Sequence, residues 1–288
     1  MYDVIIIGAG PAGISASLYT KRANLNTLVI YSGESNLEKT EKISNYYGFE
    51  EGISGENLFK AGIEQAKNLE VEVVKEEVLK IEMQMEGFTV TTSNKNYDTK
   101  TLILATGTNK NTPNIKGLKE FEGKGISYCA ICDGFFYKNK NVAVLGNGNY
   151  AVSETNDLIN IADDITILTN GKQAPEIRAD NVIINEKEIK EIHGRDKVEE
   201  VEFTDNTRLK TDGIFIAEGS AGTVEFAKKL GILIDRNKII INENMETNIP
   251  GVYACGDCTG GLLQISKSVY EGAKAGLAAV EFLRKKSV

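Results

Sequence analysis

The glycine-rich turn near the N-terminus constrains the fold more than any other feature. A short apolar run over 3–7 leads directly into Gly8-Ala9-Gly10-Pro11-Ala12-Gly13, and residues 14–23 have a helical pattern. In such a strand–turn–helix unit the glycines allow a tight turn and a close backbone approach, and free N–H groups at the helix start face a pyrophosphate. A second apolar strand follows at 27–31. The pattern predicts a Rossmann-like dinucleotide site.

The same pattern occurs again in the second half of the chain. A strand expected over 141–145 leads into a second glycine turn, Gly146 to Ala151, and then into a helix expected over 152–161. An internal repeat of this kind indicates two domains of one type. We therefore predict an α/β fold with two Rossmann-like, three-layer dinucleotide-binding domains, the second inserted in the first. The predicted boundaries are 1–112 plus 246–288 for the first domain and 113–245 for the second.

The remaining segments fit around these two turns. Apolar periodicity indicates a helix over 55–69. Three short runs alternate like the strands of an antiparallel appendage, at 71–74, 78–83 and 88–92. Near the C-terminus a strand ends in Gly256-Asp257, and a long helix is expected over 263–285.

Composition excludes several classes of protein. Of the 288 residues, 41% are hydrophobic. No apolar run approaches the roughly 18 residues that a membrane helix needs. The N-terminal apolar run is too short for a signal peptide and has no basic residue before it. A net charge of -8 argues against a nucleic-acid binder. We expect a cytoplasmic protein that binds neither membranes nor nucleic acid.

The four cysteines form two CxxC pairs, Cys129/Cys132 and Cys255/Cys258. The gap between the pairs is far longer than the ~15–20 residues of a compact zinc ribbon, so we expect no metal site. Two residues between cysteines allow one helical turn to hold both sulfurs within disulfide distance, and a cytosolic chain keeps thiols reduced unless they turn over. Asp133, next to Cys132, can deliver a proton to a leaving sulfur. The first pair therefore predicts thiol–disulfide exchange.

With these motifs in this order, the chain resembles the low-molecular-weight thioredoxin reductases over nearly its whole length. The matching segments are the glycine turn at 8–13, Asn45-Tyr46-Tyr47-Gly48-Phe49 at the place of the family's ENYPGF, Ala105-Thr106-Gly107, Cys129-Ala130-Ile131-Cys132-Asp133-Gly134 and Gly256-Asp257. The resemblance implies FAD as the cofactor and thioredoxin as the protein substrate.

The resemblance also implies roles for individual residues. The glycines of the first turn would line the pyrophosphate, Asn45 would lie near the flavin, Asp257 would bind the ribityl chain, and the backbone at Gln264 and Ile265 would face the isoalloxazine. The cofactor-binding residues expected in this way are Gly8, Gly10, Ala12, Gly13, Asn45, Thr106, Gly107, Gly256, Asp257, Gln264 and Ile265. Of the thiols, Cys132 would face the flavin and Cys129 would attack thioredoxin, with Asp133 as the acid/base.

The second domain departs from the pattern of family members that use NADPH. Those members carry GGGDSAxEE and a basic HRR-type cluster that binds the 2′-phosphate. This chain has Asn149-Tyr150 in place of Asp-Ser, Thr169-Asn170-Gly171-Lys172 with no arginine, and Leu263 where the family usually has arginine. A phosphate without a guanidinium loses charge-assisted hydrogen bonds worth about 1.5–3 kcal/mol each. We therefore expect NADPH to bind poorly.

Reduced ferredoxin is the electron donor that we expect instead. The ferredoxin-dependent flavin thioredoxin reductases are a branch of the family that this chain resembles, since they keep the FAD and CxxC motifs without the NADPH signatures. FAD can accept single electrons and pass on a pair. Three alternatives remain, namely a diverged NAD(P)H site, a dithiol oxidase that passes electrons to oxygen, and a non-catalytic redox sensor.

Two further expectations concern assembly and the second cysteine pair. The resemblance implies a homodimer, and a CxxC in the inserted domain suggests a domain rotation that alternates access between flavin and protein substrate. We interpret Cys255 and Cys258 as small buried hydrophobes, with a second redox pair as the alternative.

Overall fold

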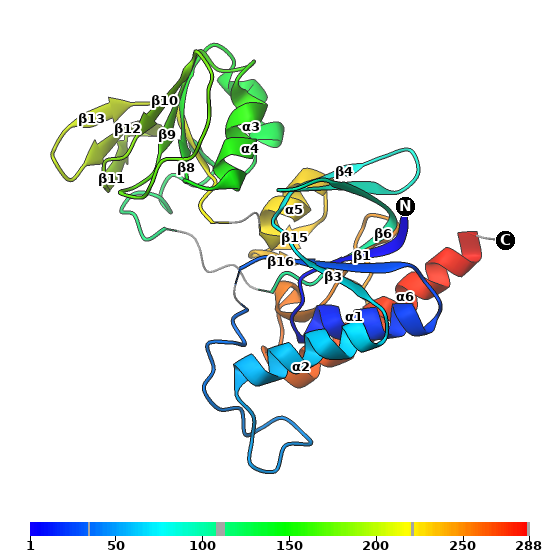
Figure 1. Cartoon of the computed structure of the whole chain (residues 1–288). Coiled ribbons are helices and arrows are strands. Elements are labelled where there is room, and N and C mark those ends of the chain that lie inside the picture. Colours follow the sequence, from blue (N-terminus) through cyan, green and yellow to red (C-terminus); the bar gives the residue numbers. More distant parts are fainter. Residues whose placement is uncertain (34, 108–112, 220–221, 287–288) are drawn as a thin grey trace. The chain divides into compact units, whose positions relative to one another are not determined.

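The structure is a computed structural model that describes residues 1–33, 35–107, 113–219 and 222–286. It consists of two compact units, one inserted in the other (Figure 1). Unit 1 comprises Met1–Asn109 and Gly222–Val288, and unit 2 comprises Lys110–Ala221. Each unit is built on its own parallel sheet, which confirms the predicted α/β fold with a second Rossmann-like unit inserted in the first.

The large sheet of unit 1 has the strand order β3-β2-β1-β6-β5-β4, with β17 beside β6. Five of these strands are parallel: β1 (Tyr2–Ile7), β2 (Thr27–Tyr31), β3 (Glu72–Lys75), β6 (Asn96–Leu104) and β17 (Val252–Ala254). Strands β4 (Val78–Met83) and β5 (Phe88–Thr92) form an antiparallel extension. The prediction that β3 belongs to this extension is wrong, because α2 (Gly55–Asn68) acts as a crossover and returns β3 parallel to β2.

Helix α6 (Ile265–Lys286) packs along α1 (Pro11–Arg22) through two glycines. A Cβ at Gly272 would lie 2.1 Å from the carbonyl oxygen of Ala12, and one at Gly276 would lie 2.7 Å from that of Ala16. Only glycine permits this approach at either position. The close packing brings the C-terminal helix against the glycine turn at the N-terminus, so the two ends of the chain build one site.

The chain rejoins unit 1 earlier than the sequence predicts. The predicted first boundary, at 112/113, borders residues 108–112, which lie outside the described residues. The sequence predicts a return at 246, whereas the structure has it at Gly222. The intervening chain forms α5 (Thr223–Leu230) and the hairpin β15 (Ile234–Asp235) and β16 (Lys238–Ile239), and α5 contacts β4 of unit 1. The apolar face of α5 is buried there, which a sequence pattern for nucleotide-binding turns does not reveal.

Unit 2 has three layers. Its central sheet is fully parallel, in the order β10-β9-β8-β14-β7, with the strands β7 (Ile126–Ser127), β8 (Asn141–Leu145), β9 (Asp164–Leu168), β10 (Val182–Asn185) and β14 (Gly213–Ile216). Helix α4 (Asn149–Leu158) and the short α3 (Ala130–Asp133) and η1 (Gly134–Tyr137) cover one face. The antiparallel sheet β11 (Ile189–Gly194), β12 (Val198–Phe203) and β13 (Arg208–Lys210) shares an apolar core with the other (Figure 1).

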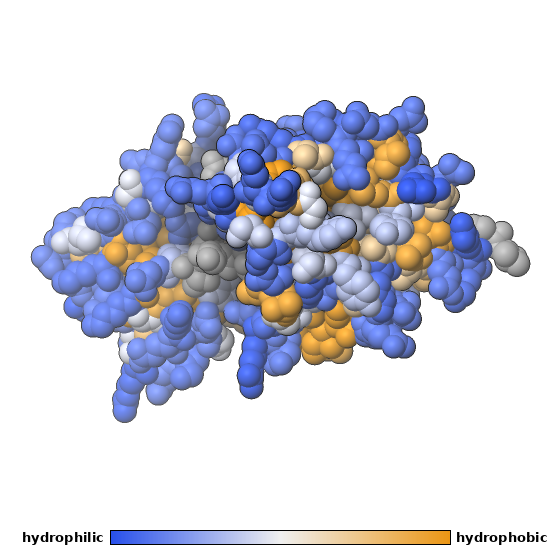
Figure 2. Space-filling view, turned by 90° about the horizontal axis from the view of Figure 1, so that it is seen from below, coloured by the Kyte–Doolittle hydropathy of each residue, from blue (hydrophilic) through white to orange (hydrophobic). Residues whose placement is uncertain are grey.

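The surface is mostly polar. In the view of Figure 2, hydrophilic side chains cover most of the visible face, with apolar patches between them. Within the described ranges, no helix has the length and apolar character needed to cross a bilayer.

Candidate active site

The first glycine turn closes tightly on the end of β6. Gly8 has φ +113°, and a Cβ there would lie 2.2 Å from the carbonyl oxygen of Ala105. A Cβ at Gly13 would lie 1.9 Å from the carbonyl oxygen of Gly8. Gly10 differs, because a Cβ there would meet no atom within 4 Å. The turn therefore needs Gly8 and Gly13 for its own packing and leaves open space at Gly10, where a pyrophosphate can approach the start of α1.

The C-terminal part of unit 1 meets this turn from the other side. Gly256 has φ +82° and begins the turn η2 (Gly256–Thr259), and a Cβ there would touch the side chain of Ala12. Asp257 is partly exposed, and its Oδ1 accepts a 3.4 Å hydrogen bond from the Ser268 hydroxyl. The structure thus brings together the predicted residues of both ends of the chain.

A hydrogen bond joins two more of the predicted flavin residues. The Asn45 side-chain amide donates to Oε1 of Gln264 over 3.2 Å, across 219 positions of sequence. Gln264 directly precedes Ile265, the first residue of α6. The free N–H groups at the start of this long helix favour a partly negative ligand atom there.

An ion pair that the sequence analysis missed supports the η2 turn. Lys267 Nζ lies 2.8 Å from Glu271 Oε2, 2.7 Å from the carbonyl oxygen of Gly256 and 2.9 Å from the Thr259 hydroxyl oxygen. Glu271 Oε2 also accepts the Gly256 N–H at 2.8 Å. Both charged side chains are largely buried. The i,i+4 spacing of Lys267 and Glu271 on α6 is the sequence pattern that indicates an ion pair. Spacing alone cannot distinguish a buried ion pair that supports a turn from a solvent-exposed pair.

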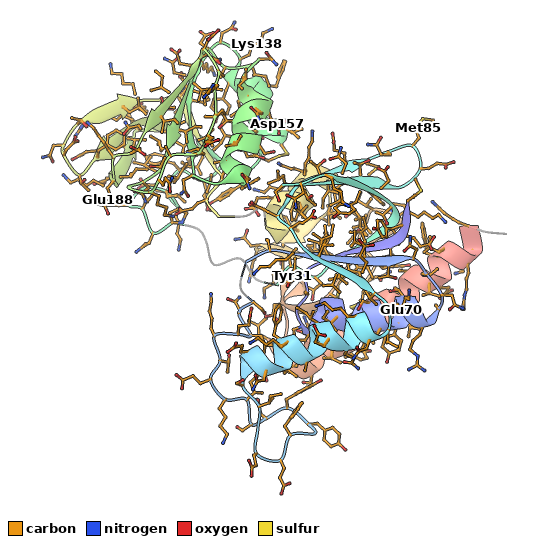
Figure 3. The ribbon with its side chains drawn as sticks, viewed as in Figure 1. Tyr31, Glu70, Met85, Lys138, Asp157 and Glu188 are labelled. Atoms are coloured by element: carbon orange, nitrogen blue, oxygen red, sulfur yellow. A yellow bond between two sulfur atoms is a disulfide. The ribbon has the colours of Figure 1, made fainter. Side chains whose placement is uncertain are left out.

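The ribose-binding acid of many dinucleotide sites is absent from β2. That strand ends at Tyr31, labelled in Figure 3, whose ring packs edge-on against Phe59 of α2 with centroids 5.9 Å apart. This contact gives Tyr31 a structural role, because its ring packs between the sheet and helix α2. The rest of the site has features that suit FAD: open space at the glycine turn, the partly exposed Asp257 carboxylate, and the Asn45–Gln264 pair beside the start of α6.

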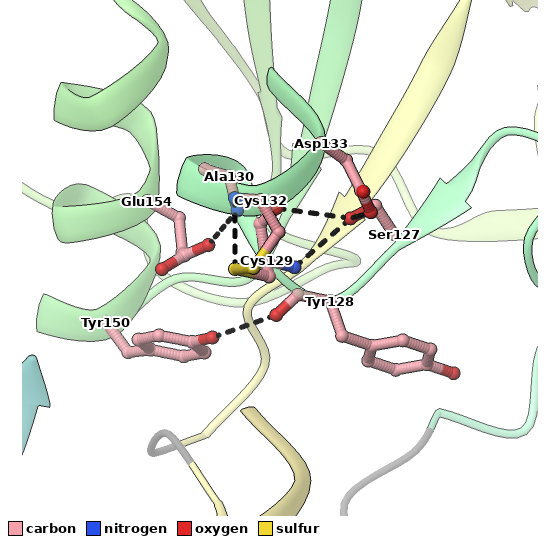
Figure 4. Close-up of a disulfide and its surroundings, with 8 residues drawn as sticks. All are labelled: Ser127, Tyr128, Cys129, Ala130, Cys132, Asp133, Tyr150 and Glu154. Atoms are coloured by element: carbon pink, nitrogen blue, oxygen red, sulfur yellow. Dashed lines mark hydrogen bonds between the residues drawn. A yellow bond between two sulfur atoms is a disulfide. The ribbon is translucent and has the colours of Figure 1, made fainter. Parts of the chain in front are cut away.

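The second functional centre is a disulfide between Cys129 and Cys132 in unit 2 (Figure 4), with Cα atoms 5.3 Å apart. Cys129 caps α3, and its Sγ accepts the N–H of Cys132 at 3.2 Å. Cys129 is only 1% exposed, whereas Cys132 is exposed. The predicted CxxC pair thus occupies one helical turn, with one sulfur buried and one at the surface.

Asp133 lies beside the disulfide, as its position in the sequence predicts. Its Oδ2 accepts a 2.7 Å hydrogen bond from the Ser127 hydroxyl, and the same hydroxyl oxygen accepts the N–H of Cys129 at 3.1 Å. Ser127, at the end of β7, therefore connects the carboxylate to the backbone of the buried cysteine. Nothing in the local sequence indicates this link, because the hydrogen bond depends on the turn that brings Ser127 beside Asp133.

The second glycine turn lies beside an ion pair and a buried tyrosine. Gly146 packs on the end of β14 as Gly8 packs on β6, since a Cβ there would lie 2.1 Å from the carbonyl oxygen of Ala217. Beyond that point Lys172 forms an ion pair with Glu218, whose second oxygen is buried without a hydrogen-bond partner among the described residues. Tyr150, in the first turn of α4, is 2% exposed. A carboxylate and a buried ring thus lie close to the second glycine turn.

The second cysteine pair is deeply buried in unit 1. Cys255 and Cys258 are free thiols that are at most 2% exposed. The Cys258 thiol donates to the carbonyl oxygens of Leu104 and Cys255. Burial raises the pKa of Cys258 to about 12 and holds the pKa of Cys255 well above its usual value. Neutral, buried thiols at ordinary pH agree with their interpretation as small hydrophobes.

Thiol counting tests this interpretation. For the oxidised protein we expect no rapid reaction with an aromatic disulfide reagent at pH 8, and two reactive thiols after denaturation, because Cys255 and Cys258 are inaccessible and protonated. Rapid reaction of either residue in the native protein, located by peptide mass spectrometry, would instead indicate a second redox pair.

A flavin-type dinucleotide site in one unit and a CxxC disulfide in an inserted Rossmann-like unit define a disulfide oxidoreductase. A family model for pyridine nucleotide-disulphide oxidoreductases matches residues 2–272. A curated thioredoxin reductase from Listeria monocytogenes is 35% identical over 304 residues, covering 99% of this chain and 95% of the relative.

Solved structures agree with this comparison. The atypical thioredoxin reductase TRi from Desulfovibrio vulgaris Hildenborough is 35% identical, with a TM-score of 0.92 and 99% of each chain covered. A ferredoxin-flavin thioredoxin reductase from Clostridium acetobutylicum is 34% identical, with a TM-score of 0.74, covering 99% of this chain and 98% of that chain. The chain therefore belongs to the pyridine nucleotide-disulphide oxidoreductases and, within them, to the thioredoxin reductase family. It is an FAD flavoprotein.

Proposed function

We propose that this protein reduces the disulfide of thioredoxin through FAD and the Cys129–Cys132 disulfide, with reduced ferredoxin as the electron donor in place of NADPH. Two ferredoxins would supply two electrons, one at a time. FAD supplies the ability to collect single electrons and deliver a pair. The disulfide would take up this pair and two protons to become a dithiol. The dithiol would then reduce thioredoxin and return to the disulfide.

The residues around the disulfide suit this exchange. Cys132 would receive electrons from the flavin side and Cys129 would attack thioredoxin, while Asp133 would hold and return the proton. Since Cys129 is the buried sulfur here, its attack requires α3 to move after reduction. The hydrogen bond from Ser127 keeps the Asp133 carboxylate in place beside the pair.

An apolar surface beside the disulfide suits a protein substrate. Ile131, Phe135 and Phe136 are 49%, 77% and 68% exposed, and all three belong to α3 or η1. Exposed aromatic side chains grouped next to a reactive centre are typical of protein docking sites. Relatives named thioredoxin reductases support thioredoxin as the partner.

The Glu218 carboxylate beside the second glycine turn is the observation that carries the choice of donor. A bound NADPH would bring its phosphates near this carboxylate, one oxygen of which is buried without a hydrogen-bond partner among the described residues. Like charges at short range are unfavourable, and the segment directly after β9, Thr169-Asn170-Gly171-Lys172, has no arginine that would offset them. The solved ferredoxin-flavin relative offers a precedent for the alternative donor.

Anaerobic flavin titration tests the donor. We expect reduced ferredoxin to bleach the flavin absorbance within seconds, and NADPH or NADH at millimolar concentration to leave it oxidised over minutes. Rapid bleaching by NADPH or NADH would contradict the ferredoxin proposal and favour a diverged NAD(P)H site. Peroxide formation with small dithiols, in place of thioredoxin turnover, would indicate a dithiol oxidase.

We further propose that the protein works as a homodimer. We also propose that it works in the cytoplasm, where protein thiols are kept reduced by thioredoxin. Light scattering on the purified flavoprotein should give twice the chain mass of 31.4 kDa. A monomer at micromolar concentration would contradict the dimer.

A further inference from the structure

Helix α4 contacts the redox segment through two residues one turn apart. Glu154 is fully buried, and its Oε2 accepts the N–H of Ala130, the first residue of α3, at 2.7 Å. The Tyr150 hydroxyl lies 3.5 Å from the carbonyl oxygen of Tyr128 (Figure 4). The helix that follows the second glycine turn therefore supports the disulfide segment.

The contacts hold the backbone on both sides of Cys129. The Ser127 hydroxyl oxygen accepts the N–H of Cys129 at 3.1 Å, and Glu154 accepts the N–H of the next residue. A carboxylate removed from water is costly to bury, so a fully buried one beside a cysteine needs a structural or chemical reason. The mechanism proposed above assigns Glu154 no role.

We propose that Glu154 is a positioning residue that keeps Cys129 buried and opposes ionisation of its thiol when the disulfide is reduced. This inference rests on the redox role of the disulfide in the proposed function. Reduction adds two electrons and two protons and gives two thiols, and loss of one proton from Cys129 gives a thiolate. The Glu154 carboxylate, bonded to the N–H of the residue after Cys129, disfavours a second negative charge on the Cys129 sulfur. Because the thiolate is not stabilised, the dithiol form is less stable and the pair remains a strong reductant for its substrate.

The other titratable groups near the pair include Asp133 on α3, Tyr137 on η1, and Tyr150 and Asp157 on α4, whereas the Tyr128 hydroxyl is bonded to Glu122. Tyrosines are neutral near pH 7. Asp133 is on the opposite side, bonded to Ser127, and is unchanged in a Glu154 variant. A difference between wild type and Glu154→Gln therefore reports on Glu154 alone.

The test is the pH dependence of the dithiol–disulfide equilibrium in the FAD-loaded protein. Wild type, Glu154→Gln and the exposed control Asn156→Ala on the same helix are equilibrated anaerobically with dithiothreitol buffers from pH 6 to 10, quenched in acid and alkylated. A plot of the dithiol–disulfide equilibrium constant against pH changes slope, or bends, at the pH where the first thiol of the pair ionises. For Glu154→Gln we expect this bend at a pH about one lower, with the reduced form favoured about tenfold more above it, or about 30 mV. Asn156→Ala should follow wild type.

An unchanged bend in Glu154→Gln, or a bend at higher pH, would overturn the inference. Amide hydrogen exchange on oxidised wild type gives a second test that needs no variant: the Ala130 N–H should exchange slowly, and fast exchange there would also overturn the inference. Neither measurement uses ferredoxin or thioredoxin, so failure of the proposed donor or substrate leaves the result interpretable.

Discussion

Replacing either Cys129 or Cys132 by serine is expected to lower thioredoxin reduction by more than about a thousandfold while FAD remains bound. The reason is that a single sulfur cannot accept an electron pair and release it as a new disulfide. Turnover would be measured with thioredoxin and reduced ferredoxin, and FAD content by absorbance. Cys258→Ala removes a buried thiol outside the pair and should keep most of the activity.

The two serine variants also separate the roles of the sulfurs. With a single-cysteine thioredoxin activated as its mixed disulfide with thionitrobenzoate, Cys132→Ser should attack through Cys129, release thionitrobenzoate and form a stable mixed disulfide with thioredoxin, and Cys129→Ser should not. The opposite outcome would assign attack to Cys132, the exposed sulfur in this structure. Normal turnover in either variant would remove the disulfide from the mechanism altogether.

Gly10→Ala is expected to weaken FAD binding by about ten- to a hundredfold, or roughly 1–3 kcal/mol, without destabilising the apoprotein. Gly10 has φ -69° and ψ -178°, which alanine adopts readily, and a Cβ there meets no protein atom. The added methyl group therefore intrudes only on the ligand. Less conformational freedom in the unfolded chain should even stabilise the apoprotein by about 0.4–1 kcal/mol. FAD titration and thermal unfolding of apoprotein measure the two effects.

Gly13→Ala provides the contrast within the same turn. Its Cβ would lie 1.9 Å from the carbonyl oxygen of Gly8, so it should lower the melting temperature of the apoprotein as well as FAD binding. If Gly10→Ala bound FAD as wild type does, the pyrophosphate would have to lie elsewhere than against this turn.

The elements around both glycine turns could be predicted from the sequence, because strand, turn and helix there are determined by local residues. In unit 1, strand β1 and helix α1 lie within a few residues of the expected bounds, and in unit 2 the same holds for strand β8 and helix α4. The CxxC disulfide and the adjacent Asp133 could also be predicted, since two thiols and a carboxylate within five residues need no long-range information.

What could not be predicted depends on contacts between distant segments. The partner of β3 is decided by the crossover through α2, and the return to unit 1 at Gly222 is decided by the burial of α5. The contact of Glu154 with the N–H of Ala130 could not be predicted because the two residues are 24 positions apart in sequence. The Lys172–Glu218 ion pair likewise joins residues 46 positions apart.

The Lys172–Glu218 ion pair would affect any attempt to engineer the binding of a nicotinamide coenzyme into this protein. Grafting an arginine into the loop after β9 would leave the Glu218 carboxylate in place and the ring of Tyr150 packed against the redox segment. Shrinking that ring would in turn loosen the support of the disulfide. If ferredoxin is the donor, as proposed, then a change to nicotinamide dependence requires substitutions at several coupled positions, and each single substitution would disturb a contact described above.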